Sequence, residues 1–287
     1  MSPTVRAALW MLGAILSFTA MAVAGRELGD RFDTFEIMMW RSAFGLIFVL
    51  LIASATGSLN QITRDAVGMH VIRNTVHFVG QNLWFFAVTA IPLAQVFALE
   101  FTTPLWVIVL SVFFLGERLT WVRATAAVMG FAGILIVARP DMAGLSPGVI
   151  AAASCAIFFA LTYVLTKRLT RTQNVTTIMF YLTFLQLIFG LIAAGYDADI
   201  AMPGAADLPF LLVVAICGLL AHFSIAKALS LAPAAVVAPV DFVRLPIIAV
   251  VAMLVYGEAL DPWVFVGAVV IFAGNYFNIW HETRKTA

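Results

Sequence analysis

The chain has 287 residues, of which 63% are hydrophobic and only 11% are charged, and its formal net charge is +1. Soluble domains carry about 25% charged residues, so this composition excludes an ordinary soluble protein. The near-neutral charge does not indicate a nucleic-acid partner, and none is predicted. The two cysteines, Cys155 and Cys217, lie inside apolar runs and form neither a disulfide framework nor a metal-binding spacing.

Ten apolar segments follow one another along the chain. Each is close to the length of about 20 residues that crosses a hydrocarbon core of about 30 Å. Their uniformly apolar character argues against the alternating strands of a membrane β-barrel. The predicted fold is therefore an all-α, polytopic membrane protein. The ten predicted spans are residues 7–24, 35–54, 68–89, 93–115, 121–138, 147–166, 175–195, 208–230, 234–256 and 263–281.

The sequence repeats itself at a constant offset of 141 residues, which separates Gly116-Glu117 from Gly257-Glu258 and Phe131-Ala132-Gly133 from Phe272-Ala273-Gly274. An odd number of spans in each copy makes the second copy enter the membrane in the opposite orientation. Inverted repeats of this kind are common in secondary transporters. The predicted units are residues 1–141 and 142–287. The first span looks like a signal peptide, but its alignment with the second copy predicts that it is retained.

Positive charges are unevenly distributed between the two ends of the predicted bundle. By the positive-inside rule, the richer end and both termini are predicted to be cytoplasmic, in a bacterial-type inner membrane. An even number of spans also requires both termini on one side. The richer end carries Arg6, Arg64, Arg118, Arg123, Lys167, Arg168, Arg171, Arg284 and Lys285, and the other end carries Arg26, Arg31 and Arg139.

The segment from Pro92 to Gly133 runs from an Ala-Ile-Pro turn through a helix containing Pro104 to Leu115-Gly116-Glu117, and the second half repeats it. This pattern resembles the drug/metabolite transporter superfamily, specifically its EamA type. The resemblance implies ten helices around a central cavity lined by the third, fourth, eighth and ninth, with the fifth and tenth at the periphery. It also implies transport of amino acids or other metabolites, including nucleotide-sugars and S-adenosylmethionine.

Among the branches of that family, the chain is somewhat similar to amino-acid exporters of the YddG type. Those exporters carry a tryptophan before the proline of the fourth helix, where this chain has Thr103. The tryptophan of their sixth helix is replaced here by Phe158 or Phe159. Specificity for aromatic amino acids therefore does not follow from the resemblance.

Charged side chains inside the hydrocarbon region normally face a protein interior or a wet cavity. Asp241 and Arg244 lie three residues apart on one helical face, which predicts an ion pair with either a structural or a substrate-binding role. Glu100 occupies the position equivalent to Asp241 in the first copy. A carboxylate in both copies predicts a proton site, a cation site or a packing hydrogen bond. Glu117 and Glu258 are predicted to cap the helices that follow them.

Four residues of the third span, Arg73, His77, Gln81 and Trp84, recur at helical spacing and form one polar stripe. Such a stripe is predicted to face the bundle interior, where it serves packing or a ligand. The eighth span contributes residues from the matching region, and positions that differ between the copies are the best candidates for selectivity. The predicted substrate-binding residues are Arg73, His77, Gln81, Trp84, Glu100, Thr103, Tyr163, His222, Lys227, Asp241 and Arg244.

The predicted function is a secondary transporter of small organic metabolites, with amino acids as the first substrate class, which works by alternating access as a monomer or a homodimer. S-adenosylmethionine and nucleotide-like solutes are the alternative substrates. The chain has no phosphate-binding G-x-x-x-x-G-K-[ST] loop, so it is not predicted to use ATP directly. It also lacks H-E-x-x-H and G-x-S-x-G, so no catalytic residue, metal or cofactor is predicted. An intramembrane enzyme and a channel or scaffold remain alternatives of a different class.

Overall fold

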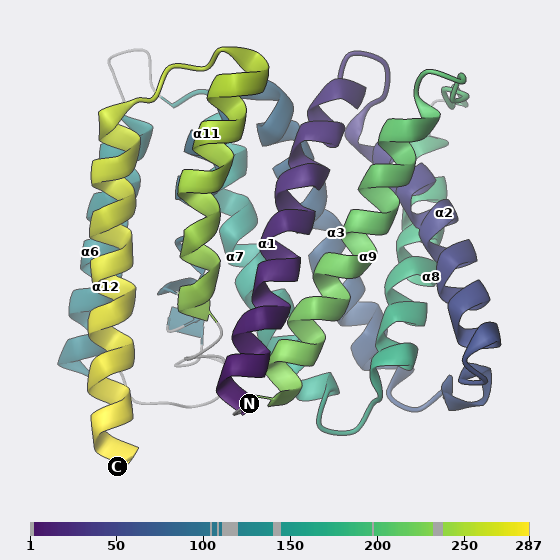
Figure 1. Ribbon diagram of the computed structural model, residues 1–287, viewed down its shortest axis with the longest axis horizontal. Coiled ribbons are helices and arrows are strands. Elements are labelled where there is room, and N and C mark those ends of the chain that lie inside the picture. Colours follow the sequence, from purple (N-terminus) through teal and green to yellow (C-terminus); the bar gives the residue numbers. More distant parts are fainter. Residues whose placement is uncertain are drawn as a thin grey trace.

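A computed structural model describes residues 3–103, 105–107, 109–110, 120–139, 145–196, 198–231 and 238–286, and every regular element within these ranges is helical (Figure 1). Ten α-helices correspond to the ten predicted spans, and two short 3-10 segments, η1 (Leu59–Gln61) and η2 (Ala238–Val243), accompany them. The helices are α1 (Pro3–Leu28), α2 (Thr34–Ala55), α3 (Val67–Ala90), α4 (Leu93–Glu100), α6 (Trp121–Ala138), α7 (Pro147–Leu169), α8 (Val175–Ala194), α9 (Leu208–Leu231), α11 (Arg244–Tyr256) and α12 (Pro262–Thr286).

Five helices of the described chain, α1, α2, α7, α8 and α9, are long and apolar enough to cross a membrane by themselves. Helix α3 is as long as these five, but its apolar sequence contains buried polar side chains, including Arg73, Asn74 and His77. These side chains lower its hydropathy and lie against protein, as the polar stripe predicts. Helices α4 and α11 are shorter, because α4 ends at a break in helical geometry and α11 begins after one.

The two copies interlock through equivalent pairs of helices. The most extensive contacts join α1 to α9, α3 to α7, α2 to α8 and α6 to α12. The 141-residue offset converts α1 into α7, α3 into α9, α2 into α8 and α6 into α12, so exchanging the copies returns the same set of contacts. The copies are therefore related by a pseudo-two-fold axis that passes between α2 and α8 and between α6 and α12.

The axis lies across the helices, because equivalent loops lie at opposite ends of the bundle (Figure 1). The α1–α2 loop lies at the end that we call the upper end, where Arg31 pairs with Asp207 of the α8–α9 connection. The equivalent α7–α8 loop lies at the lower end with both chain termini, and there Asn174 donates to the carbonyl of Gln61. The predicted inversion of the second copy is thus confirmed.

Equivalent positions also begin equivalent helices. Asp33 caps α2 by accepting from the amide of Glu36, and Asn174 caps α8 by accepting from the amide of Thr177. Asp33 and Asn174 are 141 residues apart, as are Glu36 and Thr177. The local signals that start these helices are therefore the same in both copies even where the residue types differ. These caps hold the second helix of each copy at opposite ends of the bundle.

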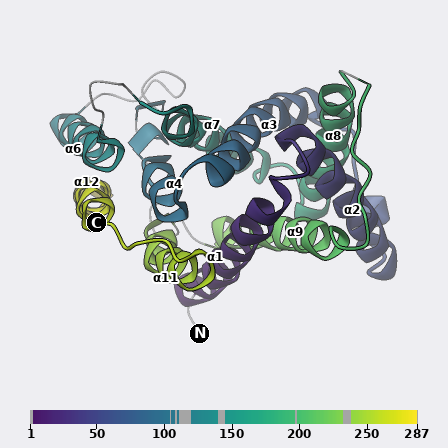
Figure 2. The ribbon, with the colours of Figure 1, turned by 90° about the horizontal axis from the view of Figure 1, so that it is seen from above.

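Seen from above, α6 and α12 form a separate pair at one edge of the molecule, beside α4 and α11 (Figure 2). Their contact depends on glycine, because a Cβ atom on Gly133 would lie 2.9 Å from the carbonyl oxygen of Gly267, and a Cβ on Gly267 would lie 2.9 Å from that of Gly133. Small residues let membrane helices approach this closely. The peripheral position of the fifth and tenth helices agrees with the resemblance.

Candidate functional site

The candidate site is built at two equivalent breaks in helical geometry, one directly after α4 and the other directly before α11. Helix α4 ends at Glu100, and a turn at Phe101 and Thr102 precedes the next helical residue, Thr103. The equivalent residues, Asp241 to Arg244, span the end of η2 and the start of α11. Interrupted helices near the middle of the bundle build the substrate sites of many transporters.

A charged cluster joins these two breaks. The Nη2 atom of Arg244 donates to Oε1 of Glu100 at 2.8 Å and to Oδ2 of Asp241 at 2.7 Å. The indole Nε1 of Trp84 donates to Oε2 of Glu100 at 2.8 Å. Arg244 is only 2% exposed, so its guanidinium depends on these two carboxyl groups for compensation. The predicted Asp241–Arg244 pair is present, and the structure adds Glu100 from the other copy.

Three aromatic rings enclose the guanidinium of Arg244. Its Cζ atom lies 4.9 Å from the ring centroid of Phe18, 4.7 Å from that of Phe97 and 5.6 Å from that of Phe101. Aromatic faces attract cations most strongly where water is excluded. The site therefore combines two carboxyl groups with a surface that favours positively charged groups.

Two other predicted residues lie beside this cluster. The hydroxyl of Thr103 donates to the carbonyl oxygen of Glu100 at 2.7 Å, so it closes the helix break. Tyr163 of α7 is half-buried and packs with residues of α1 and α9, where it is close enough to interact electrostatically with Asp241 and Arg244.

The remaining residues of the α3 stripe belong to a second polar cluster. Gln81 accepts from Nη1 of Arg41 on α2 at 2.6 Å. Arg73 donates to the hydroxyl of Thr166 at 3.2 Å and to the side-chain oxygen of Asn74 at 2.9 Å. Only Trp84 of the four stripe residues therefore reaches the Glu100–Arg244 cluster by a hydrogen bond.

Two histidines and one phenylalanine connect the clusters. The rings of His77 and His222 meet edge to face with centroids 4.7 Å apart. The ring of His222 in turn meets Phe18, with centroids 5.8 Å apart, and Phe18 covers Arg244. A continuous row of side chains thus runs between the two clusters. Lys227 lies apart from this row, with its Nζ 5.6 Å from the ring centroid of Phe223 on the same helix.

Reasoning from the sequence missed four contributors to these clusters. Phe18, Phe97 and Phe101 were not predicted, because an aromatic residue in an apolar span gives no signal that distinguishes a cation-covering ring from ordinary packing. Arg41 is recognisable from the sequence as an intramembrane charge with no acidic residue three or four positions away, although it is not among the predicted substrate-binding residues. Its partner, Gln81, comes from a different helix.

At the upper end, Arg26 and Glu258 link α1, the start of α4 and the end of α11. Arg26 pairs with Glu258 and also donates to the backbone carbonyls of Val88 and Ile91. The second carboxylate oxygen of Glu258 accepts from the amide of Leu93 at 3.0 Å. Glu258 therefore caps α4 of the opposite copy.

The predicted capping of the following helix by Glu258 was wrong. That helix, α12, is capped by Asp261, which accepts from the amide of Trp263 at 3.0 Å. The reason is that α11 ends in a left-handed Gly257, with φ of 65°, after which the chain reaches the start of α4 before α12 begins. The equivalent Glu117 lies outside the described residues.

Neutralising Glu258 is expected to open the upper end. In Glu258→Gln, Arg26 loses its carboxylate partner and α4 loses its charged cap, so a cysteine placed one turn below, at Val96, should react severalfold faster with an impermeant maleimide. Asp261→Asn is the matched control, because it weakens the exposed Arg139–Asp261 pair at the same end. Equal labelling rates in Glu258→Gln and the parent would show that this pair does not close the upper end.

Comparison with known proteins identifies the family. The model of the EamA-like transporter family matches twice, at residues 5–139 and 146–280. An S-adenosylmethionine uptake transporter of Rickettsia felis is 28% identical over 96% of this chain and 92% of its own length. A riboflavin transporter of Rhizobium johnstonii is 28% identical over 99% of this chain and 94% of its own length.

A solved crystal structure has the same fold, with a TM-score of 0.68 at 18% sequence identity. The match covers 98% of this chain and 99% of the chain in that crystal structure. The ten-helix architecture is therefore shared over the whole length. The family and the relatives are transporters rather than enzymes, which confirms the predicted class of function. The chain belongs to the EamA-like transporter family and is a multi-pass membrane transporter.

Proposed function

We propose that this transporter carries a small metabolite with an α-amino-acid group, and that S-adenosylmethionine is its first candidate substrate. The observation that carries the proposal is the buried arrangement of Glu100, Asp241 and Arg244 under aromatic rings. This arrangement offers carboxyl groups to an ammonium or sulfonium and a guanidinium to a carboxylate. An amino-acid group needs both.

Atoms left without partners in the cluster match this chemistry. Oδ1 of Asp241 and Nε of Arg244 are buried and accept or donate no hydrogen bond within the described chain. A bound ammonium would satisfy the first atom and a bound carboxylate the second, and buried polar atoms strongly favour such partners. The rings of Phe97 and Trp84 would then face a sulfonium.

The names of the relatives support this choice. The Rickettsia felis relative is named as an S-adenosylmethionine transporter, and the Rhizobium johnstonii relative as a riboflavin transporter. Riboflavin has neither an amino-acid group nor a positive charge at neutral pH, so it would leave the carboxyl groups of Glu100 and Asp241 without a cationic ligand. The charged cluster therefore favours S-adenosylmethionine over riboflavin.

The proposed mechanism is alternating access, in which residues 1–141 move against residues 142–287 about the pseudo-two-fold axis. The contacts of Arg26 and Glu258 link the two copies at the upper end in the present structure, so the movement requires their separation. We place the lower end, with both termini, in the cytoplasm, because that end is richer in Lys and Arg.

Uptake of labelled S-adenosylmethionine into proteoliposomes tests the proposal. We expect saturable uptake that unlabelled S-adenosylmethionine abolishes and that S-adenosylhomocysteine, which lacks the sulfonium charge, inhibits about tenfold less well, a difference of about 1.4 kcal/mol. Free methionine and phenylalanine serve as further competitors. Inhibition by either amino acid as strong as by S-adenosylmethionine would instead indicate a free amino-acid carrier. Saturable riboflavin uptake unaffected by S-adenosylmethionine would overturn the proposal.

A further inference from the structure

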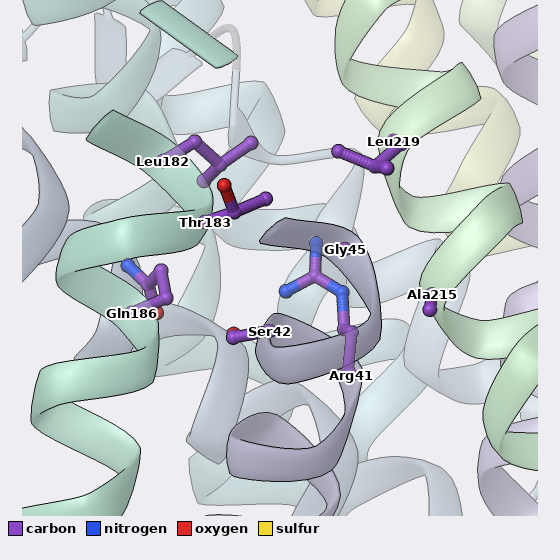
Figure 3. A pocket seen from close by; sticks show the side chains of 8 residues that line it. All are labelled: Arg41, Ser42, Gly45, Leu182, Thr183, Gln186, Ala215 and Leu219. Atoms are coloured by element: carbon purple, nitrogen blue, oxygen red, sulfur yellow. The ribbon is translucent and has the colours of Figure 1, made fainter. Parts of the chain in front are cut away.

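A second buried site lies at the other end of the pseudo-two-fold axis, where α2 crosses α8. A small pocket opens there, and Figure 3 shows the guanidinium of Arg41 between α8 on one side and α9 on the other. Six of its eight lining residues form three equivalent pairs: Arg41 with Leu182, Ser42 with Thr183, and Gly45 with Gln186. The pocket is therefore centred on the axis, as the Glu100–Arg244 cluster is.

Within the described part of the chain, Arg41 is a buried cation without an anionic partner. It is 5% exposed, it donates from Nη1 to the neutral Gln81, and its Nε has no hydrogen-bond partner. None of the ion pairs in the described part of the chain includes it. The position of the Arg41 guanidinium depends on Gly218, because a Cβ atom on Gly218 would lie 2.6 Å from Nε of Arg41. The fold thus leaves space for this guanidinium at the pocket.

A second unpaired cation lies nearby. Arg73 is 2% exposed, and its hydrogen-bond partners, Thr166 and Asn74, are both neutral. The charge of Arg41 is close enough to repel that of Arg73. Two buried cations that repel each other are costly inside a membrane protein, by several kcal/mol each in the absence of compensation. The region has the electrostatic character of an anion site.

The two copies differ here in a way that packing does not require. Leu182 occupies the position of Arg41 in the second copy, and Val214 occupies that of Arg73. Both are buried in the same helical framework, so apolar side chains fit these positions. The charges are therefore additions to a scaffold that forms without them.

We propose that Arg41 and the hydroxyl group of Ser42 form a binding site for a small anionic group such as a carboxylate, and that the charge of Arg73 adds to the attraction of the site for anions. The row formed by Phe18, His222 and His77 connects this site to the Glu100–Arg244 cluster. The anionic group belongs either to the transported substrate or to a free anion that accompanies it. Both sources have the same chemistry at the guanidinium.

Thermal unfolding of the purified protein in acetate tests the site without any transport. Acetate is compared with the bulkier sulfonate MES at equal ionic strength. We expect acetate to raise the unfolding temperature of the wild type by several degrees, because a ligand that binds only the folded state stabilises it. Arg41→Leu should lose this rise, and in MES it should unfold at a higher temperature than the wild type, since it no longer buries an unpaired charge.

The matched control is Arg31→Leu, which removes an arginine that is largely exposed and paired with Asp207. It should keep the full response to acetate. An equal response to acetate in Arg41→Leu and the wild type would overturn the proposal. This result does not depend on the identity of the substrate, so failure of S-adenosylmethionine transport and failure of the anion site are separate outcomes.

Transport measurements then distinguish the two sources. If the anion is the carboxylate of the substrate, the wild type should prefer S-adenosylmethionine to its decarboxylated analogue, and Arg41→Leu should lose this preference. If the anion is free, Arg41→Leu should keep the preference of the wild type, because Arg244 still binds the carboxylate of the substrate, and replacing acetate by MES should slow transport of both compounds in the wild type but not in Arg41→Leu.

Discussion

Replacing Arg244 by methionine is expected to abolish transport and to destabilise the folded protein. The guanidinium bridges Glu100 of the first copy and Asp241 of the second. Without it, two partly buried carboxyl groups lose their shared cation, and breaking a buried pair typically costs about 3–5 kcal/mol. A loss of about 3 kcal/mol in substrate binding corresponds to more than a 100-fold loss of affinity.

Flux in proteoliposomes and the unfolding temperature in detergent measure these two effects separately. Arg244→Lys retains the charge but not the planar fork, so it should fold better than Arg244→Met and transport only weakly. The matched control is Arg31→Met, which removes a largely exposed arginine from Asp207 and should cost much less than Arg244→Met, because Asp207 keeps its hydrogen bond from the amide of Gly204. Wild-type flux in Arg244→Met would exclude the Glu100–Arg244 cluster as the substrate site.

The second large effect is expected from Gly190→Val, which should force α2 and α8 apart. A Cβ atom on Gly190 would lie 2.8 Å from the Cα of Met39 and 3.0 Å from its amide nitrogen. Because both are backbone atoms, no side-chain rotation relieves the overlap. Overpacking typically costs about 1–3 kcal/mol, which lowers the unfolding temperature by roughly 2–10 °C for a chain of this size.

Thermal unfolding and the yield of monodisperse protein measure this change. Gly68→Val is the matched control, because a Cβ on this helical glycine has no atom within 4 Å, and it should leave both quantities unchanged. The residue equivalent to Gly190 in the first copy is Val49 of α2, so valine itself is compatible with this helix position. Unchanged stability in Gly190→Val would mean that the two helices can separate without penalty.

Much of the site followed from the sequence because the repeat relates residues far apart in the chain. The offset placed Glu100 and Asp241 at equivalent positions, and helical spacing paired Asp241 with Arg244. The structure confirms both relations and shows that they form one cluster. A residue near the symmetry axis necessarily lies close to its own equivalent, which is why two carboxyl groups distant in sequence meet at one guanidinium.

Other features of the site depended on contacts between helices. The stripe of α3 is continuous in sequence, yet Trp84 faces Glu100 while Gln81 faces Arg41. Only three residues, less than one helical turn, separate these two side chains, yet they contact different helices. Helical spacing specifies which side chains share a face, but it does not specify which helix lies opposite each of them.

The sequence alone determined the helical membrane fold, the two inverted copies and most of the charged residues in the core. Apolar length, the odd number of spans per copy and the cost of charge in a membrane are local or additive properties, so they can be read without coordinates. The tertiary structure decided which charges are paired. Glu258 caps a helix of the other copy, Arg244 has two carboxyl partners, and Arg41 has none in the described chain. Pairing depends on distances of a few ångströms between helices, and those distances are set by how the two copies pack.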